Sequence, residues 1–277
     1  SPAFLPYPQF QGIGGSAGSV NAVSNYNSLQ LSITKRFTQG VSFDFNYVWS
    51  HFMDDEDSSG WGGRGGTQVW QRAYKPSANY GASNFDIRDA FKGNVVYALP
   101  FGKGKMFLNH NSLLDLAVGG WQASGIIILS TGNPFTPTVS GSDNSYSQGG
   151  QSGNGYAWLP NQIGNPTLKN RSLQQWFDPG AFTIAPAGTF GDMKRNNIYG
   201  PGIELVNLSA AKTFSVWESV RLQIRGDATN AFNHPSFSLP NSSLVCTTPG
   251  APCTSAANIT GVSQGGRTMQ LGARLSF

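Results

Sequence analysis

Residues 29–50 read LQLSITKRFTQGVSFDFNYVWS, and this stretch decides the fold. Apolar side chains occupy every second position on both sides of the turn Thr38-Gln39-Gly40, and small polar side chains occupy most positions between them. The apolar set is Leu29, Leu31, Ile33, Val41, Phe43, Phe45, Tyr47 and Trp49. Alternation with period two around a short turn that contains glycine predicts a β-hairpin, with two strands of about ten residues that are apolar on one side only.

The same alternation returns along the chain, although Ile126 and Ile128 interrupt it in one segment. The further predicted strands lie at about residues 91–99, 121–129, 206–211, 220–229 and 269–277. Together with the first hairpin they make seven strands, most of them close to the ~9–11 residues that cross a bilayer at a tilt.

The composition fits this pattern and excludes other classes of protein. The 18 Lys+Arg and 14 Asp+Glu make 12% of the sequence, about half of the ~25% usual in a soluble domain, while the 35 glycines are well above an ordinary share. No apolar run reaches the ~18 residues that a transmembrane helix requires, and the 12% of aromatic residues argues against disorder. The net charge of +4 is scattered rather than clustered, so we expect no nucleic-acid partner.

Connection lengths predict the orientation of the strands. Short connections at residues 37–41 and 214–219 alternate with long polar ones at 52–87, 132–203 and 232–266, if residues 100–120 count as a longer turn. Membrane β-barrels have short periplasmic turns and long extracellular loops. The sequence therefore predicts an all-β, antiparallel up-and-down transmembrane β-barrel whose last strand ends on the periplasmic side.

The two faces of the strands predict lipid on one side and a wet lumen on the other. We expect aromatic side chains to gather at the strand ends of the apolar face, and LSITKRF (31–37) and LSAAKTF (208–214) both place a lysine and a phenylalanine just before a turn. The charges expected to face the lumen are Asp44, Arg221, Arg225, Asp227 and Arg274. Structural ion pairs, contacts with a plug and guidance of a ligand all remain open as their roles. A secreted β-sandwich is the alternative fold.

Seven strands cannot stand alone in a bilayer, because an open sheet would leave two edges of unpaired backbone groups in hydrocarbon. We therefore expect the chain to be the C-terminal portion of a larger closed barrel. In this interpretation residues 1–26 form an outer loop that leads into the first strand, and residues 27–277 form strands, periplasmic turns and extracellular loops.

Several motifs could carry chemistry, and none gives a catalytic or metal site. Cys246 and Cys253 lie in the stretch CTTPGAPC, which favours a small disulfide-closed loop in an oxidising compartment. The histidines lie on different connections, so we expect no metal centre. Residues 55–57, Asp-Glu-Asp, read as a solvated acidic loop or a loose cation site. Residues 14–18 fit G-x-S-x-G without the strand and helix that a nucleophile elbow needs. We expect no enzyme activity and no cofactor.

Seven segments, taken in order, resemble a known family over nearly the whole chain from about Tyr7. They are YNSLQLSITKRF, GVSFDFNYVWSHFMDD, FDIRDAFKGNVVYALPFGKG, GGWQASGIIILSTGNPFT, WFDPGAFTIAPAGTFGDMKRNNIYGPG, RLQIRGDATNAFNHPSF and MQLGARLSF. This order is similar to the C-terminal barrel of TonB-dependent outer-membrane receptors of the Oar-like group. The resemblance implies a 22-stranded barrel with an N-terminal plug that imports siderophores, glycans or peptide-like nutrients.

The resemblance also implies partners and further site residues. The partners are the N-terminal plug and remaining strands of the same receptor, the TonB–ExbB–ExbD system, the barrel-assembly machinery and outer-membrane lipid. Leu271, Ala273, Leu275 and Phe277 look like the signal that the assembly machinery reads. From the residues themselves, we expect aromatic side chains of the outer loops to bind the ligand, or to pack on each other. These candidates are Trp61, Trp70, Tyr74, Tyr80, Tyr156 and Trp158. A surface or adhesion barrel that presents these loops is the alternative function.

Overall fold

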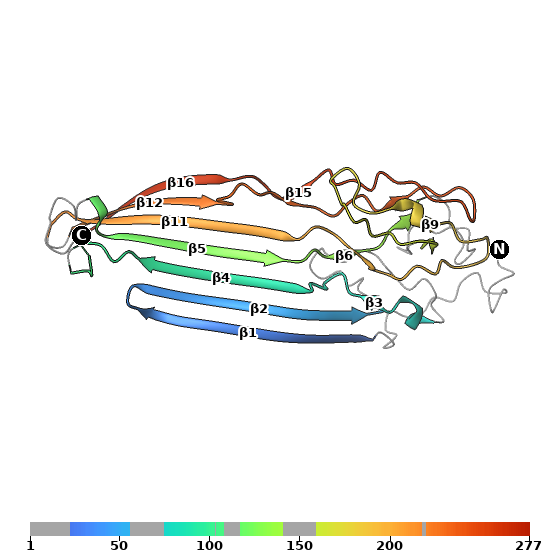
Figure 1. The fold of residues 1–277 in the computed structure, drawn as a ribbon, viewed down its shortest axis with the longest axis horizontal. Helices are drawn as coiled ribbons and strands as arrows, with labels where there is room; N and C mark the ends of the chain where they lie inside the picture. The colour runs from blue at the N-terminus through green and yellow to red at the C-terminus, as the bar shows by residue number, and fades with distance from the viewer. Residues whose placement is uncertain (1–22, 56–74, 103, 108–116, 141–158, 218–219) are drawn as a thin grey trace.

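A computed structural model describes residues 23–55, 75–102, 104–107, 117–140, 159–217 and 220–277. Its main feature is one antiparallel sheet in which seven long strands follow each other in chain order, so the predicted all-β architecture is confirmed (Figure 1). The strands are β1 (Ser24–Thr38), β2 (Val41–Asp54), β4 (Asp89–Ala98), β5 (Trp121–Ser130), β11 (Ile203–Ser215), β12 (Arg221–Thr229) and β16 (Thr268–Ser276).

The two ends of the sheet differ in the way predicted from connection lengths. Residues 39–40, 99–120 and 216–220 connect strands at one end, which we call the turn end, where the C-terminus also lies (Figure 1). The described parts of the connections 55–88, 131–202 and 230–267 lie at the other end, which we call the cap end. At the first turn, Gln39 and Gly40 both have positive φ (53° and 82°), as a two-residue hairpin loop requires.

The strand register places the alternating apolar positions on one face of the sheet. One row across this face is Ile33, Phe45, Gly93, Ile127 and Val206, and another is Val95, Gly125, Leu208, Ala228 and Met269. The opposite face carries most of the polar positions, for example Ser124, Ser209, Asp227 and Gln270 in one row. Ile126 and Ile128 lie on this polar face, which explains why β5 alternates less clearly than its neighbours.

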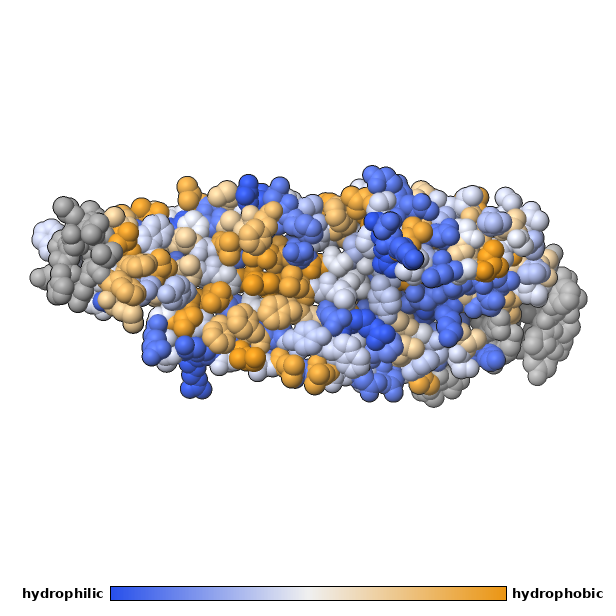
Figure 2. All heavy atoms as spheres, in the orientation of Figure 1, coloured by the Kyte–Doolittle hydropathy of each residue, from blue (hydrophilic) through white to orange (hydrophobic). Residues whose placement is uncertain are grey.

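The apolar face is open to its surroundings. Leu29, Leu31 and Ile33 of β1 are 53–64% exposed, and Leu271 of β16 is 84% exposed. Figure 2 shows apolar side chains gathered over the strands and hydrophilic ones over the cap end. A β-sandwich would cover such a face with a second sheet, and the described residues contain only two-stranded sheets besides the large one.

Three details differ from the sequence-based expectations. β1 begins at Ser24 rather than at residue 27. β1, β2 and β11 contain 15, 14 and 13 residues, more than a bilayer crossing needs. On the apolar face of β2 aromatics follow one another at every second position from Phe43 to Trp49 rather than only at the strand ends, and the rings of Phe43 and Phe45, near the turn end, stack at 5.0 Å.

The other named short elements lie at the cap end. They are the 3-10 turns η2 (Pro76–Asn79) and η3 (Pro179–Ala181) and the strands β3 (Gly81–Ala82), β6 (Pro134–Phe135), β7 (Thr138–Val139), β8 (Asn161–Gln162), β9 (Phe182–Thr183), β10 (Ile198–Tyr199), β13 (Ser236–Phe237), β14 (Ser243–Leu244) and β15 (Val262–Gln264). Across the described ranges, no helix has the length and apolar character needed to span a membrane.

Lys212 is the charged residue at the turn end of the apolar face of β11. The sequence predicts a side chain that snorkels to water, but Lys212 is only 6% exposed. Its Nζ donates to the backbone oxygens of Ala117 (2.8 Å) and Gly119 (2.9 Å) and lies 5.3 Å from the ring centre of Trp121. The lysine therefore ties the connection before β5 to the sheet.

Gly93 is the position where the sheet tolerates least added volume. A Cβ at residue 93 would lie 2.6 Å from Cδ1 of Phe45, and that ring cannot move aside freely because it stacks against Phe43 and Phe91. We predict that Gly93→Ala lowers the free energy of unfolding by about 1–3 kcal/mol, the usual cost of overpacking. Denaturant unfolding of the purified protein in detergent, followed by tryptophan fluorescence, measures it.

Gly272→Ala on β16 is the matched control, because a Cβ there would meet no atom within 4 Å. Equal destabilisation by both substitutions would contradict the packing account of the Phe43–Phe45–Phe91 stack.

Candidate functional site

The connections at the cap end fold together into one structure, which we call the cap (Figure 1). Strand pairs join segments far apart in sequence: β6 pairs with β10, β7 with β14, β8 with β9 and β13 with β15. The pair β7–β14 is parallel, and it links the connection after β5 to the connection after β12.

The cap has its own hydrophobic core. Its buried members are Phe135, Phe177, Ala181, Phe182, Met193, Ile198, Leu244, Cys253 and Ala257. Phe177 and Phe182 are fully buried, with ring centres 6.3 Å apart. A disulfide joins Cys246 to Cys253, and Cys246 packs against the same core. The described parts of the long polar connections thus form a packed unit rather than separate loops.

A buried ion pair fastens the cap to the sheet. The side chain of Arg195, in the cap, is 1% exposed and forms an ion pair with Asp54, the last residue of β2. Its Nη2 also donates to the backbone oxygen of Asp54 (2.6 Å), and its Nε donates to that of Asn79 (3.2 Å). One guanidinium thus connects three segments of the chain, as a planar fork of donors can.

A second buried carboxylate, Asp86, lies in the same region. Its oxygens accept hydrogen bonds from the backbone N–H of Phe52 (2.8 Å) and the hydroxyl of Tyr199 (2.8 Å), and Arg88 Nε lies 3.4 Å away. Nδ1 of His51 is also 3.4 Å from Asp86. Burial and the bond to Asp86 raise the pKa of the Tyr199 hydroxyl, against a lowering by Arg88, so Tyr199 stays a neutral donor at neutral pH.

Asn196 completes the attachment. Its Nδ2 donates to the backbone oxygen of Ala82 and to Oδ1 of Asn84, both at 2.8 Å, and its backbone N–H donates to Thr136 Oγ1. Asn196 has a φ of 54°, a conformation that asparagine adopts more readily than most residues. These polar groups hold the cap in one orientation relative to the strands.

The predicted ligand-binding aromatics are placed only in part. Trp61, Trp70, Tyr74, Tyr156 and Trp158 lie outside the described residues. Tyr80 follows η2 directly and is 39% exposed. In the acidic stretch 55–57, Asp55 is buried and its Oδ1 accepts the backbone N–H of Val23 at 2.9 Å, whereas Glu56 and Asp57 are outside the described residues. The described residues hold no group of three metal-binding side chains.

The predicted lumen charges share the polar face of the sheet. Arg225 Nε donates to Asp227 Oδ1 at 2.8 Å and contacts Ser209 Oγ at 3.1 Å. Arg221 and Arg274 lie further toward the turn end on the same face. On β2, Asp44 accepts hydrogen bonds from Thr34 and Asn46. Arg225 and Asp227 form an ion pair with each other, while Arg221, Arg274 and Lys92 are exposed positive charges on the same face.

The C-terminal strand carries the predicted assembly signal on the apolar face. Leu271, Leu275 and Phe277 are 84%, 59% and 96% exposed. Within the described sheet, β16 pairs with β12 along one edge and with no strand along the other. Ala273 pairs with Ile224 of β12, and both side chains lie on the apolar face.

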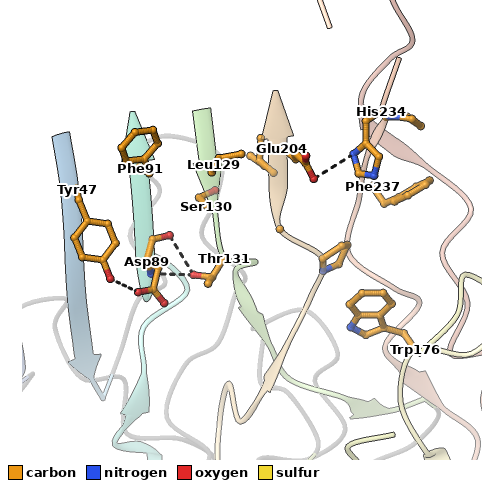
Figure 3. Close-up of a pocket in the computed structure, with 14 residues that line it drawn as sticks. Tyr47, Asp89, Phe91, Leu129, Ser130, Thr131, Trp176, Glu204, His234 and Phe237 are labelled. Carbon is orange, nitrogen blue, oxygen red and sulfur yellow. Dashed lines mark hydrogen bonds and ion pairs between the residues drawn. The ribbon is translucent and has the colours of Figure 1, made fainter. Parts of the chain in front are cut away.

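A pocket of about 490 Å³ lies on the apolar face where the sheet meets the cap. Phe91 and Leu129 of the sheet and Trp176 of the cap are among its lining residues (Figure 3). Polar pairs border it: the Tyr47 hydroxyl donates to Asp89 Oδ1 at 2.6 Å, and His234 Nδ1 lies 3.8 Å from Glu204 Oε2. Sequence reasoning assigned no pocket here, because its residues come from six separate segments.

Comparison with known families shows to which family of proteins the chain belongs. A family model described as outer membrane beta barrel domain matches residues 2–270. The chain belongs to this barrel family. A search of curated proteins finds no match.

Membership of the barrel family fixes the surroundings of the sheet. The barrel lies in the bacterial outer membrane, as predicted, and the secreted sandwich is excluded. In such barrels the apolar face contacts lipid. On β5 this face runs from Trp121 to Leu129, and about eight residues at ~3.3 Å each and a tilt of ~40° span about 20 Å, close to the ~25 Å of a barrel's apolar band. The pocket therefore lies at the outer edge of the band.

The ion pair of Arg195 should dominate the attachment of the cap. We predict that Arg195→Met lowers the stability of the cap by about 3–5 kcal/mol, because the carboxylate of Asp54 is left buried without its partner. Hydrogen exchange measured by mass spectrometry should then show faster exchange in residues 159–202 and in the end of β2.

Lys194→Met is the control, since Lys194 is the exposed neighbour and carries the same charge. Similar exchange in both variants would mean that the apolar core alone holds the cap.

Proposed function

We propose that this barrel is the C-terminal portion of a TonB-dependent receptor of the Oar-like group, which takes up a nutrient across the outer membrane. The nutrient classes are a siderophore, a glycan or a peptide-like ligand. In this proposal the chain is a transport component, not an enzyme, and works without a cofactor.

One observation carries the proposal: the seven-stranded sheet is open. Among the described strands, β1 pairs only with β2 and β16 only with β12, so two long edges lack partners. In hydrocarbon each unpaired backbone group costs several kcal/mol, and a barrel must therefore close with further strands. A receptor barrel of 22 strands would supply them, and this sheet would be about a third of it.

Two further features agree with a receptor. A barrel of this size has a wide lumen that a plug must fill, and the exposed Arg221 and Arg274 on the polar face could meet such a plug or the substrate path. The folded cap stands at the extracellular mouth, where a ligand would first bind. The proposed partners are the plug and remaining strands, TonB–ExbB–ExbD, the barrel-assembly machinery and lipid.

Energised uptake is the direct test. Cells that depend on the intact protein for growth on one of a panel of iron–siderophores, oligosaccharides and peptides should stop accumulating that nutrient when ExbB is deleted. Binding of the nutrient to the cell surface should persist, because the cap and its ligand-binding side chains remain in place. Radiolabelled nutrient, counted in washed cells, gives both quantities.

The adhesion barrel is the second candidate, and the packed, disulfide-closed cap favours it, since a rigid cap presents a fixed surface. Deleting the gene would then reduce cell attachment while nutrient accumulation stays unchanged on the whole panel. That pair of results would overturn uptake as the main function.

The role of the C-terminal residue as an assembly signal has a separate test. We predict that Phe277→Asp removes most of the protein from the outer membrane, because the substitution replaces a 96% exposed aromatic on the apolar face with a charge. Phe232→Asp, at an equally aromatic and 71% exposed position of the cap end, should leave the amount unchanged. Quantitative immunoblotting of outer-membrane fractions measures both, and normal levels of the Phe277→Asp protein would refute the role.

A further inference from the structure

The pocket at the outer edge of the sheet lies on the lipid-facing side of the barrel, not on the lumen side. Tyr47, Phe91, Leu129 and Glu204 form one row across the apolar face, because the register pairs Tyr47 with Phe91, Phe91 with Leu129, and Leu129 with Glu204. The next row toward the turn end is Phe45, Gly93, Ile127 and Val206, which is wholly apolar. The pocket thus begins where the apolar band ends.

Apolar side chains form the part of the pocket that continues this band. Phe91 and Leu129 come from the sheet, and Pro235 and Phe237 come from the connection after β12. Trp176 reaches the pocket from the cap (Figure 3), and its Nε1 is fixed by a hydrogen bond of 2.9 Å to the backbone oxygen of Tyr199. An acyl chain lying along the band could continue into this pocket without crossing a polar surface.

Hydrogen-bonding groups border the pocket on the cap side. The carboxylate of Asp89 accepts from Tyr47 at 2.6 Å, and the backbone N–H of Asp89 donates to Thr131 Oγ1 at 3.1 Å. Glu204 and His234 are 61% and 58% exposed at the side chain, so both are accessible to a ligand. Carboxylate oxygens accept hydrogen bonds from hydroxyl groups, so this side of the pocket suits the hydroxyl groups of a sugar.

We propose that this pocket binds an outer-leaflet glycolipid, with an acyl chain against Phe91, Leu129 and Trp176 and sugar hydroxyls at Asp89 and Glu204. The cavity volume of about 490 Å³ is within the ~300–1,000 Å³ of ligand pockets. The apolar part of the pocket continues the lipid-facing band, so an outer-leaflet lipid lies next to it. The site is independent of the transported nutrient, because it opens away from the lumen.

Two variant pairs test the site on the intact protein, extracted from outer membranes in mild detergent. Trp176→Ala removes the aromatic wall, and Tyr47→Phe removes one hydroxyl with little effect on volume. Their controls are Trp217→Ala and Tyr97→Phe, at exposed positions of the same residue types near the turn end. Mass spectrometry of 3-hydroxyacyl chains measures the lipopolysaccharide that remains bound after detergent exchange.

The wild-type protein and both controls should retain a stoichiometric amount of lipopolysaccharide. Trp176→Ala should lose most of it and Tyr47→Phe part of it. The proposal is overturned if the wild-type protein retains no lipopolysaccharide, or if all variants retain the same amount as the wild type. A second arm adds the acyl-free disaccharide of the same lipid: displacement by it as effective as by intact lipid would make the pocket a soluble-glycan site and would also overturn the proposal.

Discussion

Backbone hydrogen bonding in a medium without water is the constraint on which the structure depends. Inside the bilayer each N–H and C=O must find a partner within the protein, and only a continuous strand ladder gives β-structure that possibility. The antiparallel order from β1 to β16 supplies it across the sheet, and the alternation of side chains then follows from the pleat. Because the ladder fixes the register, it also fixes which residues contact lipid. The register further limits side-chain volume, since the ring of Phe45 leaves no room for a Cβ at Gly93.

Outside the bilayer the constraint is relaxed, and the chain uses different interactions. The strands that pair in the cap have only two or three residues, so its backbone ladder is short. Its stability comes from a core around Phe177 and Phe182 and from buried charges. Arg195 and Asp86 bind backbone groups of several segments as well as side chains, so they specify an orientation that apolar contacts alone would leave less defined.

The sequence predicted the sheet well and the cap poorly, for a physical reason. Alternation with period two is a local signal: Leu29, Leu31 and Ile33 indicate the apolar face of a strand even when the neighbouring strands are unknown. The cap core instead joins Phe135 to Leu244 and Ala257, whose contacts depend on how long connections pack, and no local period marks them. The cysteine spacing was the exception, because it predicted a small loop. Lys212 was misjudged for a similar reason, since the carbonyls of Ala117 and Gly119 come from another connection.

We expect function at the boundary between the membrane-embedded sheet and the cap. At the row of Tyr47 and Glu204 the ladder still runs, but the surroundings change from hydrocarbon to water, so aromatic and ionisable side chains become compatible on one face. The cap reaches this row through Trp176, and the ion pair between Arg195 and Asp54, the last residue of β2, fastens it to the sheet. Because this attachment sets the position of the cap beside the pocket, a molecule bound in the pocket would stabilise the cap in its present orientation.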